Sequence, residues 1–231
     1  MEKNSFLIIL GTAHLGTTPG KCSPDGKLKE AVYSRELVSD IEAILKDLGY
    51  NVIVDYRELT GISNDQELSY RVGKVNKLCQ TWGKDNVIYV SIHVNAAGNS
   101  GWSTAGGWSA YTSIGQTKSD ILAECLYEAA EDNLGEYEKI MSAGKEAGNY
   151  GKSQKHIRKD LTDGDSDLEE NFYVLYNTLC PAVLTENLFQ DNRRDVEYLL
   201  SDLGRHNLSR LHVEGIIRYY DKFSTHTGGN V

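Results

Sequence analysis

Four residues that can bind a metal ion or move a proton lie at the boundaries of predicted strands and helices. His14 follows the apolar run 6–10, His93 ends a second apolar run, and Glu186 follows a third. Sites in open α/β sheets form just beyond the carboxyl ends of the strands, so we expect these three side chains to converge on one edge. Glu30 opens the first predicted helix and faces the same edge if the preceding glycine-rich loop folds back.

Each of these residues also has an ordinary structural role when it is taken alone. A histidine after a strand is more often a hydrogen-bonded loop residue, and a glutamate in a first helical turn is a favourable charge at the helix dipole. Glu186 alone could be an exposed loop carboxylate. The joint occurrence favours chemistry, because two histidines and one carboxylate form a recognised open zinc site. A further carboxylate nearby then provides the general base that hydrolysis requires.

The elements that position these residues alternate along the chain. Period-two and continuous apolar runs predict strands, and apolar residues at spacings of three and four predict helices. The expected strands are 6–10, 51–56, 86–93, 108–113, 172–176 and 182–185, and the expected helices are 28–48, 65–82, 119–130 and two more before residue 220. This order indicates a single-domain α/β protein with a mostly parallel twisted sheet and helices on both faces. We expect the domain to span 1–223, with a polar insertion at about 135–170 and a frayed tail at 224–231.

Composition excludes several classes of protein. The chain has 231 residues, with 24 Lys and Arg against 33 Asp and Glu, for a net charge of −9. This balance argues against nucleic acid as a partner, because such affinity needs a net-positive face. No apolar run approaches the length of a membrane span, and the apolar stretch in residues 1–11 is too short for a signal peptide, so we expect no export signal there.

Two other motifs have weaker chemical interpretations. Gly11 and Gly16 follow a strand as in a phosphate-binding loop, but Thr17-Thr18 occupies the place of the required lysine. The aspartates of 163–167 alternate as in a calcium loop, but the glycine and terminal glutamate of that motif are not at the required positions. We expect a solvated acidic loop there.

Several segments match one family's motifs in order. Residues 11–16, Gly-Thr-Ala-His-Leu-Gly, correspond to a D-P-G-H-G-G loop, and residues 91–96, Ser-Ile-His-Val-Asn-Ala, to S-I-H-A-N-A. Residues 181–189, Pro-Ala-Val-Leu-Thr-Glu-Asn-Leu-Phe, correspond to P-A-x-L-V-E-x-G-F. The chain therefore resembles the zinc-dependent N-acetylmuramoyl-L-alanine amidases of the Amidase_3 family, bacterial enzymes that cut stem peptides from peptidoglycan. It departs from them at residues 11–13, which replace Asp-Pro-Gly, and at Leu188, which replaces Gly.

The resemblance implies a role for each candidate residue. His14, Glu30 and His93 would bind Zn²⁺, and Glu186 would be the catalytic residue that takes a proton from water and passes it to the departing amine. The substrate would be the amide between N-acetylmuramic acid and L-alanine.

We also expect four residues to bind the substrate. Arg71 and Asn95 lie in segments that resemble the family's motifs. Trp102 and Trp108 belong to a glycine-rich loop, where aromatic side chains either line a sugar or peptide cleft or cap the core beneath the loop.

The resemblance also implies a partner and a location. Some members carry a blocking helix in the region of 135–170 until a partner pulls it away, so an activator could act on this insertion. Action on the cell wall places the protein in the periplasm or outside the cell, and a phage endolysin released through a membrane lesion is one such case. Two alternatives stay open: a zinc peptidase of carboxypeptidase type acting on another amide, and a non-catalytic wall-binding relative.

Overall fold

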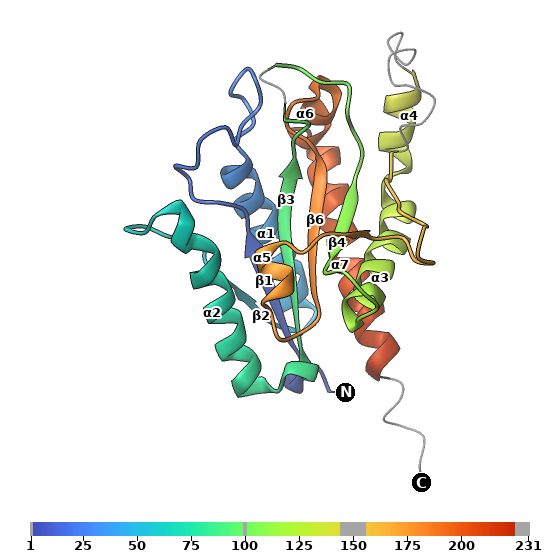
Figure 1. The fold of residues 1–231 in the computed structure, drawn as a ribbon. Coiled ribbons are helices and arrows are strands. Elements are labelled where there is room, and N and C mark those ends of the chain that lie inside the picture. Colours follow the sequence, from blue (N-terminus) through green and yellow to red (C-terminus); the bar gives the residue numbers. More distant parts are fainter. Residues whose placement is uncertain (1, 99–100, 144–155, 225–231) are drawn as a thin grey trace.

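A six-stranded sheet in the order β2-β1-β3-β6-β4-β5 organises the molecule (Figure 1). The computed structural model describes residues 2–98, 101–143 and 156–224. The strands are β1 Leu7–Thr12, β2 Asn51–Val54, β3 Val87–Asn95, β4 Ser109–Thr112, β5 Leu168–Glu169 and β6 Ala182–Phe189. All neighbours pair in parallel except β4 and β6, which are antiparallel. The predicted α/β class with a mostly parallel sheet is confirmed.

Seven α-helices within the described residues accompany the sheet. They are α1 Glu30–Asp47, α2 Asn64–Trp82, α3 Lys118–Asn133, α4 Gly135–Ala143, α5 Tyr173–Tyr176, α6 Arg193–Leu199 and α7 Asp202–Ser224, with short 3₁₀ turns at Lys3–Ser5 and Lys84–Asn86. None of the described helices is long and apolar enough to cross a membrane.

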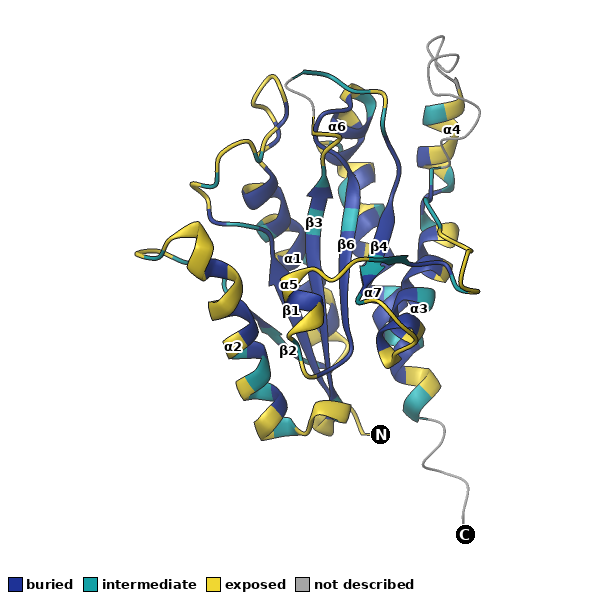
Figure 2. Ribbon diagram, viewed as in Figure 1, coloured by how far each residue is buried: buried dark blue, intermediate teal, exposed yellow. Residues whose placement is uncertain are grey.

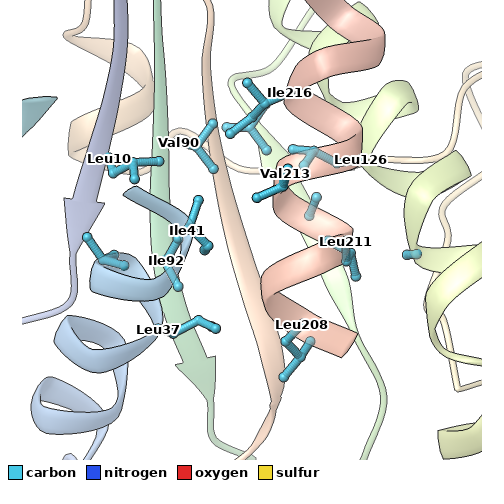
Figure 3. Close-up of a cluster of buried hydrophobic side chains, with 14 of the residues drawn as sticks. Leu10, Leu37, Ile41, Val90, Ile92, Leu126, Leu208, Leu211, Val213 and Ile216 are labelled. Carbon is cyan, nitrogen blue, oxygen red and sulfur yellow. The ribbon is translucent and has the colours of Figure 1, made fainter. Parts of the chain in front are cut away.

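Two hydrophobic layers enclose the sheet because side chains alternate between its faces along each strand. Ile8 and Leu10 of β1 face the layer built by α1, α3 and α7, whereas Leu7 and Ile9 face the layer built by α2 and α5. Figure 3 shows the first layer, in which side chains from β1, β3, α1, α3 and α7 meet. The central strands are buried along most of their length, so only their ends can contact a ligand (Figure 2).

Two element predictions need correction. Residues 172–176 were expected as a strand, but Tyr173–Tyr176 forms the helical turn α5. A five-residue apolar run does not distinguish a strand from a buried helical turn, and here Val174 and Leu175 pack against the layer of α2. The first helix begins at Glu30 rather than at residue 28, because Lys29 still forms a β-bridge with Cys22.

The insertion expected at 135–170 contains regular structure at both ends. It begins with α4 and ends with the short strand β5. Residues 144–155, at its centre, lie outside the described residues, as does the expected tail apart from Ser224.

Candidate metal centre

Three predicted side chains meet at the carboxyl edge of the sheet. The Glu30 carboxylate lies 3.3 Å from Nε2 of His14 and 3.1 Å from Nδ1 of His93, in both cases through Oε1. One donor atom from each residue lies within 4.8 Å of the others. Two nitrogens and one oxygen are the donor set of an open zinc site, so the residues fit the predicted metal.

The sheet register explains this convergence. β1 and β3 pair in parallel, with Thr12 opposite Ile92, so His14 and His93 both emerge at the same edge. Glu30 reaches this edge because the loop before α1 folds back, and its backbone N–H donates a 3.0 Å hydrogen bond to the carbonyl of Lys21. The loop before α1 therefore folds back, which was the condition predicted from the sequence for Glu30 to face this edge.

Glu186 joins the three donors from the neighbouring strand. It lies opposite His93 in the register between β3 and β6. Both residues, with His14 and Glu30, line one open cavity of about 290 Å³. The Oε2 atoms of Glu30 and Glu186 are buried without a hydrogen-bond partner. Buried carboxylate oxygens require a partner, and a cation with its water would supply one to each.

The electrostatics differ sharply between the two glutamates. Burial alone would raise the pKa of Glu30, but the hydrogen bonds and charges of His14 and His93 hold it far below its usual range. Burial and the nearby Glu30 charge raise the pKa of Glu186 well above the ordinary value, and only Lys21 opposes them. Burial also lowers the pKa of His93, which favours the neutral imidazole that a metal requires. Glu30 is therefore the anionic member of the site and Glu186 the carboxyl that readily carries a proton.

The His14 loop follows an unusual backbone path. His14 has φ of 48°, in the left-handed region that few non-glycine residues adopt. Arg35 holds the loop by donating hydrogen bonds of 2.9 Å to the carbonyl of His14 and 3.3 Å to that of Ala13. Ser34 Oγ accepts a 2.8 Å bond from the Ala13 N–H and donates to the carbonyl of Ile92 on β3. α1 thus fixes both histidine-bearing segments.

A buried ion-pair network supports the same loop from α2. Arg71 donates hydrogen bonds to Asp55 at 2.7 Å, to Glu67 at 2.9 Å and to Thr12 Oγ1 at 3.2 Å. Asp55 also accepts a 3.0 Å bond from the Tyr89 hydroxyl. A side chain at Gly11 would collide with that tyrosine ring, so the family's aspartate at this position has no space here. Asp55, from the end of β2, supplies a buried carboxylate beside the loop instead.

The structure places the four predicted substrate-binding residues in different environments. Asn95 and Arg71 line the cavity, although the guanidinium of Arg71 is committed to the network above and the residue is only 2% exposed. Trp102 is half-buried beside the guanidinium of Arg193 and is not among the lining residues. The prediction for Trp108 is wrong, because its side chain is fully buried and its indole N–H donates to Asn187 Oδ1 at 3.1 Å.

Sequence reasoning missed one wall of the cavity. Leu68 of α2, Phe172, Tyr173 and Leu184 line it with apolar and aromatic surface, and Lys21 adds a positive charge opposite. The signal was present in the aromatic pair 172–173, which was assigned to a buried strand. It also missed the support of Asn187, which donates from Nδ2 to the His93 carbonyl at 2.9 Å.

A β-bulge separates the Glu186 segment from regular pairing. His93 pairs with Glu186 but Asn95 pairs with Phe189, so β6 has one extra residue. Leu188 lies in this extra segment with φ of 63° and is fully buried. The position where the family has glycine therefore keeps a glycine-like conformation with a leucine side chain.

Comparison with known proteins identifies similar chains. Residues 8–218 match a family model described as N-acetylmuramoyl-L-alanine amidase. The endolysin of Bacillus phage SPP1 is 26% identical over 213 residues, and the amidase CwlM of Bacillus licheniformis is 25% identical over 207 residues. These matches cover 92% and 88% of this chain, and the chain spans 65% and 67% of the lengths of those relatives.

Solved structures show the same fold. The CwlD amidase from Clostridioides difficile, in complex with the GerS lipoprotein, matches with a TM-score of 0.70 and 16% identity over 94% of this chain and 99% of that chain. At this identity the likeness establishes the fold alone.

Proposed function

Because the chain belongs to the N-acetylmuramoyl-L-alanine amidase family, we propose that it is a zinc hydrolase that cleaves the amide between N-acetylmuramic acid and L-alanine in peptidoglycan. One observation carries the proposal. Three donor atoms of the kind that bind zinc lie within 4.8 Å of one another in the cavity. The neighbouring strand β6 contributes Glu186, whose Oε2 has no hydrogen-bond partner. Residues 1–223 form the catalytic domain in this proposal.

His14, Glu30 and His93 would hold the metal. Zinc in such a site supplies a Lewis acid that activates water and polarises the scissile carbonyl. Glu30 contributes the negative charge, while its Oε1 also accepts a 3.2 Å hydrogen bond from the Val94 N–H, which fixes the carboxylate orientation. The remaining Oε2 faces no protein donor within hydrogen-bond distance.

Glu186 is the proposed catalytic residue. Its Oε2 accepts the proton of the attacking water and later delivers it to the amine of the departing L-alanine. In this role Glu186 must alternate between its ionised and its protonated form, so neither form can be strongly disfavoured. Burial already stabilises the protonated form. Lys21, which lines the same cavity, stabilises the ionised form.

The substrate would extend along the cavity from Asn95 toward the wall of Leu68, Phe172 and Tyr173. Apolar and aromatic surface suits the sugar face or the stem-peptide side chains, with Asn95 available as a polar contact. Trp102 keeps a proposed substrate role only at the outer rim. Arg71 acts in this proposal mainly by fixing the His14 loop.

We further propose that the protein acts on the cell wall, in the periplasm or outside the cell. One of the two relatives is named an endolysin and the other an N-acetylmuramoyl-L-alanine amidase. We also propose that a partner protein acts on residues 135–170. The CwlD amidase, which has the same fold, was solved in complex with a lipoprotein, so a protein of this fold can bind a second protein.

The decisive experiment digests purified peptidoglycan and measures zinc in the same protein sample. We expect about one zinc ion per chain, free stem peptides that begin with L-alanine, and intact glycan strands. The His93→Ala variant should lose both zinc and release of peptides. Asn171→Ala, a change on an exposed residue outside the cavity lining, is the matched control.

Other outcomes would contradict the proposal in distinct ways. New reducing sugar ends would identify a glycosidase, and cleavage within the stem peptide would identify a peptidase. Binding to peptidoglycan with no product would identify a wall-binding relative. Activity that survives both chelation and His93→Ala would exclude the metal mechanism.

A further inference from the structure

Four carboxylates gather near the opposite side of the sheet from β2, where the chain enters β5. We call Asp120, Glu124, Asp165 and Asp167 the β5 carboxylate cluster. Asp120 and Glu124 lie one turn apart near the start of α3, and the loop before β5 packs on them through a 2.5 Å hydrogen bond from the Ser166 N–H to Glu124. The cluster is separate from the candidate metal centre, since none of its members lines that cavity.

The expectation of a solvated acidic loop is wrong for part of this segment. Asp163 is exposed, but Asp165 is half-buried and Asp167 is only 1% exposed. Asp120 is 7% exposed. Partners from distant sequence cause this burial, because Thr112 of β4 donates a 2.5 Å bond to Asp167 Oδ2 and Gln116 donates a 3.0 Å bond to Asp165 Oδ2.

Within the part of the chain that the structure describes, no basic side chain neutralises the cluster. Among the described residues, none of the ion pairs includes any of its four members. Lys118 and Lys159, which belong to neighbouring segments, pair with Asp85 and Glu131 instead. A buried carboxylate without a cation is costly, since desolvation of the charge is not repaid.

The hydrogen bonds leave two oxygens free. Oδ1 of Asp165 and Oδ1 of Asp167 are both buried and have no hydrogen-bond partner. The two carboxyls also interact directly. Burial, with the charges of Asp165 and Asp120, raises the pKa of Asp167 to about 7, against the Thr112 hydrogen bond that lowers it. Near neutral pH the cluster therefore needs either a proton or a cation.

We propose that the β5 carboxylate cluster is a binding site for a divalent cation of the calcium type. Its donors are all oxygens, which hard cations such as Ca²⁺ prefer, whereas zinc prefers nitrogen and sulfur. Oδ1 of Asp165 and of Asp167 are the proposed protein ligands, with Asp120 as the adjacent charge and water completing the shell. The ion would join the loop before β5 to β4 and α3.

The test titrates CaCl₂ into the zinc-loaded 231-residue chain by calorimetry and follows the melting temperature in parallel. We expect one Ca²⁺ per chain and a melting temperature that rises with calcium concentration. Asp167→Asn and Asp165→Asn should each weaken binding at least tenfold. The half-buried Asp165 provides a variant that folds even if the buried substitution does not.

Asp47→Asn is the matched control, because it removes the same charge from an exposed position at the end of α1. It should bind Ca²⁺ as the wild type does. The proposal is overturned if neither Ca²⁺ nor Mg²⁺ binds at millimolar concentration, in which case the carboxyl pair keeps a proton instead. It is equally overturned if both cluster variants bind Ca²⁺ with wild-type affinity.

Discussion

The candidate metal centre and the β5 carboxylate cluster both bury a carboxylate with one free oxygen, yet they treat its charge in opposite ways. At the metal centre, hydrogen bonds and charges from two histidines outweigh the burial of Glu30 and lower its pKa. In the cluster, burial and neighbouring carboxylates raise the pKa of Asp167 to about 7. The two histidines thus favour the anionic form of Glu30 even without a metal, whereas Asp167 keeps its proton up to about pH 7.

This difference shows that donor composition, more than burial, determines which ion each region can take. Nitrogen donors beside one carboxylate favour zinc, and oxygen donors alone favour a hard cation. The backbone differs in parallel. The metal centre contains the left-handed residues His14 and Leu188, whereas the corresponding left-handed residue beside the cluster is Gly164.

The largest expected effect tests the proton-transfer residue of the metal centre. Glu186→Gln keeps the shape of the side chain but removes its basicity, so amidase turnover should fall by about 10²–10⁴-fold. Zinc content should stay at the wild-type level, because Glu186 is not a proposed ligand. Peptide release and metal content are measured on the same preparation. Near-normal turnover would remove Glu186 from the mechanism.

The second prediction breaks the support of the His14 loop. Arg71→Met leaves Asp55 and Glu67 buried without their cation, and it should lower the free energy of unfolding by about 3–5 kcal/mol. Urea denaturation measures the change. Arg57→Met is the control, because Arg57 is exposed and Glu42 keeps a second ion pair with Lys46, so the change should cost only about 0–1 kcal/mol. A change in KM with unchanged stability would instead favour the substrate-binding role expected from the sequence.

The third prediction concerns backbone strain beside Glu186. Leu188→Ala keeps the left-handed conformation and removes a buried side chain, so it should cost about 2–5 kcal/mol of stability. Leu188→Gly removes the same side chain but relieves strain of about 1–2 kcal/mol. Glycine should therefore be the milder substitution in thermal denaturation. Equal costs, or a larger cost for glycine, would show that strain at this bulge is negligible.

The last prediction is a pH dependence at the β5 carboxylate cluster. The folded state retains the Asp167 proton up to about pH 7, whereas the unfolded chain loses it near the ordinary value of 3.8. The folded state therefore binds more protons in this window, and its stability falls as pH rises through it.

Asp167→Asn should flatten this slope in calcium-free buffer, measured as melting temperature between pH 4 and pH 7. The exposed Asp163→Asn should leave the slope unchanged. If the Asp167 variant shows the wild-type dependence of melting temperature on pH, another buried acid causes it. Asp195 is one such acid, because burial raises its pKa to about 7.

The sequence was informative where topology alone brings residues together. His14 follows β1, and His93 and Glu186 lie toward the carboxyl ends of β3 and β6. These three strands are parallel, and parallel strands end at one edge whatever their loops do. It was less informative where a loop's direction decides the outcome. For Trp108 the sequence left two interpretations open, lining a cleft or capping the core, and the β-bridge with Ile157 and the bond to Asn187 turn the indole inward.

The same limit applies to the acidic loop. Its burial depends on Thr112 and on α3, both tens of residues earlier in the chain, and no local pattern encodes that contact. The support of His14 by Asp55 and Arg71 was hidden for the same reason, since Asp55 after β2 and Arg71 of α2 meet only in the folded chain.

The position of α7 has a practical consequence for attachment. Tyr220, near the end of this helix, contacts Phe6 just before β1 and Tyr50 just before β2, with ring centroids 5.4 and 5.3 Å apart. Both described chain ends therefore lie at the amino edge of the sheet (Figure 1), whereas His14 and His93 lie toward the carboxyl ends of β1 and β3. A tether, fusion partner or solid support joined at either described end would therefore attach away from the candidate metal centre.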